Sequence, residues 1–200
     1  MQVISNQDET IRLFKSDVFE FFTRVHWSVP LWLFVPVLLY ALYQAFTLGF
    51  WGPTLLAYGG GLAFWTLLEY GMHRFFFHRK PQSRLGKRLL FLFHGIHHAY
   101  PSDSWRLVMP PAVSIPLALV FDQLFHGLLP TAIAHASFAG LVSGYLGYDM
   151  IHYATHHRKM KGPWIKFLKQ YHLRHHFQDE ERGYGVSSPL WDYVFRTRLS

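Results

Sequence analysis

The sequence predicts an all-α integral membrane protein with about four transmembrane helices and a cytoplasmic helical cap. Two observations predict this class. Four apolar stretches each approach the roughly 20 residues that a helix needs to cross a bilayer; they are residues 29–50, 52–70, 109–129 and 131–151. Lysine and arginine are absent from the turns near residues 51 and 130 and gather before residue 25, from Arg74 to Arg106, and from Arg158 onward. By the positive-inside rule these three basic regions are cytoplasmic, as an even number of spans requires.

The 200 residues suffice for one domain over residues 1–200, with no repeat or linker that divides it. We expect residues 1–28 to form an amphipathic segment on the membrane surface. Residues 29–151 form the four-span region, which includes a cytoplasmic loop over 71–108, and residues 152–200 form a C-terminal cytoplasmic cap. The chain has no cysteine and therefore no disulfide framework. A bacterial cytoplasmic membrane or the endoplasmic reticulum is the expected location, with the basic residues orienting the chain and no nucleic acid as partner.

Each expected span has its own start or packing signal. The first two meet at a turn over residues 49–53 that contains glycine and proline. The third opens with Pro110 and Pro111, which suit the start of a helix, and carries Asp122. In the fourth, three glycines offer a small-residue face for close helix packing, namely Gly140, Gly144 and Gly147.

Histidines are concentrated in four clusters that hold 11 of the 14 in the chain. They read His73-x4-His78, His94-x2-His97-His98, His152-x3-His156-His157 and His172-x2-His175-His176. Helix positions i, i+3 and i+4 share a face, so each of the last three clusters can direct two or three imidazoles at one place. The pair five residues apart fits better where a helix ends or bends. We expect the isolated His26, His126 and His135 to be ordinary hydrogen-bonded residues.

These clusters predict a transition-metal centre. Imidazole is a common ligand of iron, zinc and copper, whereas magnesium and calcium prefer oxygen. A structural zinc site usually includes thiolates, which this chain lacks. About ten histidines exceed what one ion can bind and suit two ions with five or six ligands each.

The residues that surround the clusters resemble the fatty acid hydroxylase superfamily, which includes the sterol desaturases. The segments that carry the likeness are His73 to His78, His94 to His98, Asp103 to Pro111 and Gly183 to Asp192. Within the superfamily the chain is most similar to the sphingolipid fatty acid 2-hydroxylases. The eukaryotic members of that group carry an N-terminal cytochrome b5 domain with a His-Pro-Gly-Gly motif, which does not occur in this sequence.

The resemblance implies an O2-dependent di-iron monooxygenase that hydroxylates C2 of a fatty acyl chain of ceramide type. Zinc can replace iron in purified protein, and a separate donor such as a cytochrome b5 or a ferredoxin supplies electrons. It also implies that His157 does not bind metal and that ten histidines do; the ligands are His73, His78, His94, His97, His98, His152, His156, His172, His175 and His176.

Further site residues are predicted near the clusters. Glu69, Asp103 and Asp149, together with His157, are candidates to orient ligand imidazoles. The expected substrate contacts are Tyr100, Trp105, Arg106, Tyr184 and Trp191, with pairing to Asp103 as the other interpretation for Arg106. Two alternative functions remain open at this stage. One is a sterol, carotenoid or alkyl-lipid oxygenase of the same superfamily, and the other is a non-catalytic membrane metal-binding or transport protein.

Overall fold

The computed structural model describes residues 3–199, which are helical apart from turns and loops. In chain order the elements are α1 (Asp17–Phe21), α2 (Val29–Leu48), α3 (Trp51–Gly71), the π-helical turn η1 (Met72–Phe77), α4 (Arg84–Leu90), a second π-helical turn η2 (Phe91–Gly95), α5 (Ile96–Ala99), α6 (Pro111–Leu128), α7 (Thr131–His157), α8 (Pro163–Phe177) and α9 (Leu190–Val194). The predicted all-helical class is confirmed. Pro110 and Pro111 begin α6 as expected.

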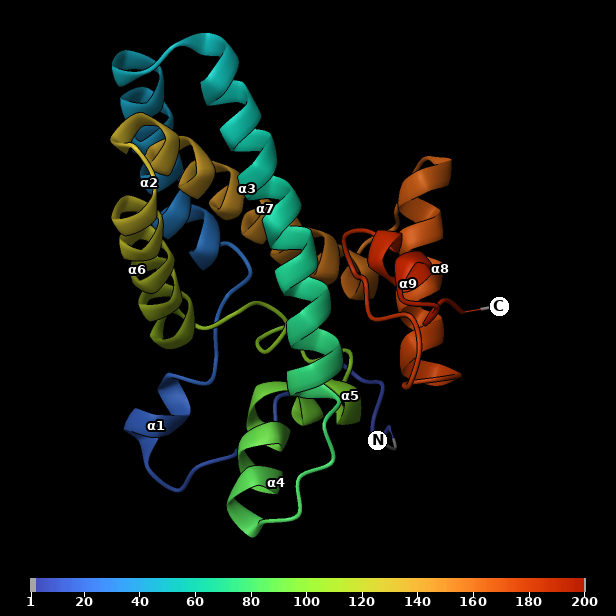
Figure 1. Cartoon of the computed structure of the whole chain (residues 1–200). Helices are drawn as coiled ribbons and strands as arrows, with labels where there is room; N and C mark the ends of the chain where they lie inside the picture. The colour runs from blue at the N-terminus through green and yellow to red at the C-terminus, as the bar shows by residue number, and fades with distance from the viewer. Residues whose placement is uncertain (1–2, 200) are drawn as a thin grey trace.

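Helix α7 is the centre of a bundle in which it packs against α2, α3 and α6 (Figure 1). The core of this bundle is apolar and partly aromatic. Phe34 of α2 and Trp65 of α3 both contact the ring of Tyr145, with ring centroids 5.1 and 5.5 Å apart. The rest of the core comes mainly from α7, and comprises Phe138, Ala139, Leu141, Val142 and Leu146.

The crossing of α3 and α7 depends on glycine. A Cβ added to Gly61 would lie 1.9 Å from the carbonyl oxygen of Ser137, and one added to Gly140 would lie 2.0 Å from that of Tyr58. A Cβ added to Gly144 would lie 2.5 Å from Cγ of the Trp65 side chain. The predicted small-residue face is therefore present at Gly140 and Gly144. It does not extend to Gly147, where a Cβ would meet nothing within 4 Å.

Within residues 3–199, two helices, α2 and α6, are long and apolar enough to cross a membrane. Their most apolar windows are only 17% and 6% buried, so the apolar side chains face outward and not into a protein core. Trp32 and Leu39 on α2 and Leu128 on α6 are examples, being 79%, 61% and 72% exposed. Such a surface suits lipid, because large apolar patches are rare on soluble monomers. The other two expected spans form α3 and α7, which are long enough, with 21 and 27 residues, but are not apolar enough to be candidate spans by composition. They contain five and three glycines, against none in α2 and one in α6.

The two tight turns lie together at one end of the bundle, since the Cβ position of Gly49 is 2.9 Å from the Cβ of Ala132. The polypeptide that follows α3 and α7 leads away from this end to the remaining helices, as Figure 1 shows. Within residues 3–28, the described part of the expected amphipathic segment, only α1 is helical. The residues before α1 hydrogen-bond instead to the end of α5 and to Glu20.

Candidate metal centre

Ten histidines converge in two groups of five, and they are the ten predicted ligands. We call them histidine group A (His73, His78, His94, His98 and His175) and histidine group B (His97, His152, His156, His172 and His176). Within each group the candidate ligand atoms all lie within 4.8 Å of one another. The groups adjoin, since the rings of His98 and His176 stack with centroids 4.2 Å apart.

The two clusters of the form His-x2-His-His each serve both groups. On α8, His172 and His176 are four residues apart and meet in group B, whereas His175 points into group A. The helical turn before Tyr100 repeats this division with the groups exchanged, since His94 and His98 belong to group A and His97 to group B. Residues i and i+4 share a helix face, and neighbouring residues diverge by about 100°. Each of the last three clusters thus directs two imidazoles at one group, as its spacing allows, and the two clusters of the form His-x2-His-His send their remaining imidazole to the other group.

A π-helical turn explains how His73 and His78 meet despite their spacing. In η1 the backbone N–H of His78 donates to the carbonyl of His73, a bond that spans five residues. This geometry places residues i and i+5 on one face, and the two Nε2 atoms lie 3.2 Å apart. The prediction that the pair lies where a helix ends or bends is confirmed, since α3 ends at Gly71.

The spacing of the Nε2 atoms fits metal ligation. In group A, neighbouring Nε2 atoms are 3.0 to 3.3 Å apart, and in group B they are 2.9 to 3.1 Å apart. Two nitrogens bound at about 2.1 Å to one ion and at right angles lie about 3.0 Å apart. The two groups are thus consistent with a di-metal site in which each group of five histidines would hold one ion.

Backbone carbonyls orient three of these histidines. The Nδ1 atoms of His73, His152 and His175 lie 2.5, 3.1 and 2.7 Å from the carbonyl oxygens of Tyr184, Leu107 and Arg182, respectively. A carbonyl only accepts, so Nδ1 carries the proton and Nε2 of the neutral ring presents a lone pair. Nε2 lone pairs that face one another at about 3 Å repel unless a cation lies between them. This arrangement of lone pairs is the one that metal ligation needs.

Buried carboxylates support those carbonyls and do not touch the imidazoles that they were predicted to orient. Glu69 accepts hydrogen bonds from the N–H groups of Val186 and Ser187, at 2.7 and 2.8 Å, and from the Ser187 hydroxyl. These residues follow Tyr184, whose carbonyl holds His73. Asp192, which the sequence reasoning missed, accepts from the N–H groups of Tyr184 and Gly185.

Asp149 has the corresponding place beside group B. Both of its carboxylate oxygens lie 3.3 Å from the N–H of Met109, two residues after the carbonyl that holds His152. Asp103 instead accepts from Thr10, from the N–H of Trp105 and from Arg106. His157 lies outside both groups and stacks on Tyr153, with ring centroids 4.9 Å apart.

The three isolated histidines make local contacts outside the two groups. His26 Nδ1 lies 2.8 Å from the hydroxyl of Ser28. His126 Nδ1 donates to the carbonyl of Asp122, and its ring contacts that of His135 with centroids 4.5 Å apart. His126 and His135 lie in helices and His26 in the segment before α2, and all three are hydrogen-bonded or packed locally, as expected.

Burial makes the histidine groups sensitive to acid in the metal-free protein. Desolvation and the neighbouring His175 lower the pKa of His78 to about 3, and desolvation lowers that of His175 to about 4. In the unfolded chain such residues take up a proton near pH 6.5. The stability that these neutral imidazoles contribute is therefore fully present above pH 6.5. It is lost as the pH falls toward the pKa values of the folded protein.

We accordingly expect the free energy of unfolding of metal-free protein to fall between pH 6.5 and 5. Urea unfolding of chelator-treated protein at a series of pH values measures this. Exposed carboxylates stay largely ionised in that window, so they contribute little to the slope. A flat profile would mean that the groups are already protonated or hydrated in the folded state.

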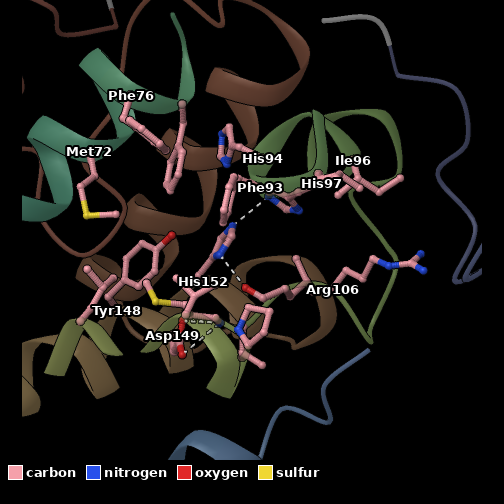
Figure 2. Close-up of a pocket in the computed structure, with 18 of the residues that line it drawn as sticks. Met72, Phe76, Phe93, His94, Ile96, His97, Arg106, Tyr148, Asp149 and His152 are labelled. Atoms are coloured by element: carbon pink, nitrogen blue, oxygen red, sulfur yellow. Dashed lines mark hydrogen bonds between the residues drawn. The ribbon is translucent and has the colours of Figure 1, made fainter. Parts of the chain in front are cut away.

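An apolar cavity of about 920 Å³ reaches both histidine groups, through His94 of group A and His97 and His152 of group B (Figure 2). Its wall comes mostly from apolar side chains of α3, η1, η2, the loop after Arg106, α6 and the N-terminal segment. Tyr148 and Asp149 line it close to His152. This combination of an apolar wall and few polar groups is typical of a small-molecule site.

Of the five predicted substrate residues, only Arg106 lines this cavity, and its guanidinium points away from the histidines in Figure 2. It pairs with Asp103 at 3.0 Å, which was the other interpretation. The four aromatic residues lie elsewhere: the Tyr184 ring packs on group A, the Trp191 indole donates to Thr66, Trp105 contacts His26, and Tyr100 ends α5. Tyr148 was missed, although its position four residues before His152 could have indicated it.

Comparison with known proteins agrees with this geometry. The model of the family "Fatty acid hydroxylase" matches residues 58–197. The dihydroceramide fatty acyl 2-hydroxylase FAH2 of Arabidopsis thaliana is 43% identical over 189 residues, which cover 93% of this chain and 79% of the relative. The ceramide very long chain fatty acid hydroxylase SCS7 of Saccharomyces cerevisiae is 46% identical over 142 residues, 70% of this chain and 37% of that protein.

A solved structure shares the fold. It is described as full-length scs7p with only the hydroxylase domain visible, and it superposes with a TM-score of 0.88 at 39% identity. The match covers 94% of this chain and 72% of that chain. The resemblance stated from the histidine motifs is therefore confirmed, and this chain belongs to the fatty acid hydroxylase family.

Proposed function

We propose that this protein hydroxylates C2 of the fatty acyl chain of a ceramide-type lipid, using O2 and two metal ions held by histidine groups A and B. The observation that carries the proposal is the apolar cavity that ends on His94, His97 and His152, between the two groups. The names of the relatives, dihydroceramide fatty acyl 2-hydroxylase and ceramide very long chain fatty acid hydroxylase, support the substrate class.

Iron is the working metal in this proposal. When bound, two iron ions supply the redox chemistry by which O2 attacks an unactivated C–H bond, which acid–base groups alone cannot do. Ten neutral imidazoles suit ferrous iron, and they suit zinc still better by the Irving–Williams order. Protein purified after overexpression can therefore hold zinc and be inactive until it is reloaded with iron.

The protein itself positions the acyl chain and excludes water from the reacting carbon. An acyl chain in the cavity lies against apolar side chains, which exclude water from the reacting carbon. The Tyr148 ring stacks on that of His152, with centroids 5.5 Å apart, and its hydroxyl lies at the histidine end of the cavity (Figure 2). We assign this hydroxyl to the polar group that adjoins C2, so that C2 and not a carbon further along the chain faces the two metal positions.

The membrane arrangement in this proposal has four spans, α2, α3, α6 and α7, with both histidine groups on the cytoplasmic side. In protein reconstituted in one orientation, cysteines placed at Leu85 and Phe177 should react with an impermeant thiol reagent on the same side. A cysteine at Phe50, which is 85% exposed at the opposite end, should react only on the other side. Labelling of Leu85→Cys and Phe177→Cys from opposite sides would exclude a single cytoplasmic centre.

Two electrons per turnover come from a separate acidic carrier, such as a cytochrome b5 or a ferredoxin. Arg84, Lys87 and Arg88 on the exposed helix α4 are the predicted docking residues. Their joint replacement by glutamine should raise the apparent Km for the carrier at low salt and leave metal content unchanged. Steering between exposed charges also weakens as the Debye length falls, from about 10 Å at 0.1 M salt to about 3 Å at 1 M. An unchanged Km for the carrier at low salt would assign these residues to membrane orientation alone.

Lipid analysis of cells that make the protein tests the function. We expect 2-hydroxylated acyl chains in ceramide-type lipids of cells that express the wild type and none above background with His97→Ala. Hydroxylation at another carbon, or in a sterol or carotenoid, would assign the chain to a different reaction of the same family. Iron-loaded protein that stays inactive while the zinc form turns over would refute the redox assignment.

A further inference from the structure

The N-terminal segment of residues 3–25, here called the strap, forms one wall of the cavity. Four of its residues line the cavity, namely Leu13, Phe14, Phe22 and Thr23. The strap begins beside the histidines, where the N–H groups of Ile4 and Ser5 donate to the carbonyl of Ala99 at 2.8 and 3.2 Å. It ends at Val25, whose N–H donates to the carbonyl of Trp105 at 2.8 Å.

A buried ion-pair cluster holds the strap in place. Arg106 donates to Glu20 at 2.9 Å, to Asp103 at 3.0 Å and to the carbonyl of Ile11 at 2.7 Å. The side chains of Arg106, Glu20 and Asp103 are only 4%, 7% and 2% exposed. Breaking a buried pair is costly, because one charge is left without its partner. We call this ion-pair cluster, Arg106 with Glu20 and Asp103, the latch.

Glu20 also fixes the fold of the strap itself. Its second carboxylate oxygen accepts from the N–H groups of Leu13 and Phe14, both at 2.9 Å. Burial opposes the charge, but these bonds and the neighbouring Arg24 and Arg106 hold the pKa of Glu20 below its usual value. The carboxylate therefore stays ionised, and the latch stays charged, at neutral pH.

The mouth of the cavity is apolar and lies beside α1. Four cavity-lining phenylalanines are also exposed, and they mark the opening: Phe22 at 55%, Phe75 at 63%, Phe76 at 55% and Phe93 at 46%. Polar groups do not frame this opening, as they would if it admitted a water-soluble substrate.

Helix α1 adds a further apolar surface next to the mouth. Val18, Phe19 and Phe21 are 65%, 64% and 74% exposed. Eight residues after Phe21 the chain enters α2, one of the two candidate membrane helices, and Figure 1 shows α1 beneath the lower ends of α2 and α6. Continuity with a lipid-facing helix and an exposed apolar surface suit a position in the bilayer interface.

We propose that α1 lies in the bilayer interface and is the movable wall of the cavity mouth, and that the latch of Arg106, Glu20 and Asp103 restrains its opening to a membrane lipid. The identity of that lipid rests on the proposed function, but the position and movement of α1 do not. In this proposal the latch forms again after lipid has entered, so it governs the rates of lipid entry and exit more than their ratio.

The position of α1 is tested by fluorescence, and the absence of cysteine makes single-site labelling simple. Phe19→Cys protein with an environment-sensitive dye, in phosphatidylcholine and phosphatidylglycerol vesicles, should be quenched by lipids with a nitroxide near the headgroup. Gln7→Cys, an exposed site in the same strap, is the matched control and should not be quenched. An unquenched Phe19 site would overturn the proposal, and so would equal quenching at both sites.

The latch is tested by stopped-flow binding of a fluorescent ceramide to metal-loaded protein. Glu20→Gln should raise the association and dissociation rate constants severalfold and by the same factor, with the Kd unchanged. Asp17→Asn is the control, since Asp17 is exposed and pairs with Arg12 and not with Arg106. Unchanged rate constants, or a change in Kd alone, would make the latch a fixed structural feature and overturn the gating.

Failure of the proposed substrate and failure of the proposal on α1 and the latch give different results. A ceramide that does not bind wild-type protein would contradict the proposed substrate, while quenching at Phe19 would still decide where α1 lies. If Glu20→Gln protein loses its metal and does not fold, Thr10→Ala gives the second variant, because it removes the 2.6 Å bond to Asp103 and leaves the charges in place. It should raise both rate constants by a smaller common factor, and unchanged constants would again overturn the gating.

Discussion

Alanine in place of His97 or His175 is expected to abolish lipid hydroxylation. Each substitution removes one of five ligands from a different group, His97 from group B and His175 from group A. Loss of a partner behind a ligand typically costs about 10- to 100-fold in metal affinity or activity, and loss of a ligand itself should exceed this. Turnover by iron-loaded protein and metal content per chain measure the effect, and the metal content should fall by one ion of the two.

His126→Ala and His135→Ala are the matched controls, because these histidines lie outside both groups. They should keep most of the activity and all of the metal. Full activity in His97→Ala protein would contradict a di-metal reaction, and equal losses in all four variants would indicate a general effect on folding.

Gly140→Ala is expected to cause a large loss of stability, comparable with that of Gly61→Ala on the facing helix. The new Cβ would lie 2.0 Å from the carbonyl oxygen of Tyr58, and backbone cannot yield as a flexible side chain can. Overpacking of cores typically costs about 1–3 kcal/mol, and separation of α3 from α7 should reach or exceed the upper value. A lower midpoint of thermal unfolding in detergent, with loss of metal, is the expected result.

Gly147→Ala is the control on the same helix, because a Cβ there meets nothing within 4 Å. It should be neutral or slightly stabilising, since alanine favours helix over glycine by about 1 kcal/mol. Equal melting temperatures for the two variants would mean that α3 and α7 are not in contact at Gly140.

Much of the metal centre could be predicted from the sequence because its ligands come in local patterns. Spacings of three and four residues on a helix identify histidines that act together, and the resemblance selected ten of the eleven. Which ion each histidine serves was beyond such reasoning. That division depends on how α5, α7 and α8 face one another, and on the π-helical turn that brings His73 and His78 to one side.

The carboxylates show the same limit. Their helical spacing from His73 and His152 indicated direct contact, but Glu69 and Asp149 bind backbone segments more than 100 and about 40 residues away in the chain. The position of the strap could not be predicted either, because its partners in the loop around Arg106 lie more than 80 residues later in the chain. Contacts of this kind follow from tertiary packing and leave no local periodicity to find.

The most direct test of the central claim is the product that iron-loaded protein forms under ¹⁸O2 from a ceramide-type lipid with deuterium at both C2 positions, with an electron donor supplied. Mass spectrometry should find one ¹⁸O atom in a hydroxyl at C2 and one deuterium retained there. Oxygen derived from water, or a hydroxyl at a carbon other than C2 with both deuterium atoms retained, would contradict the account.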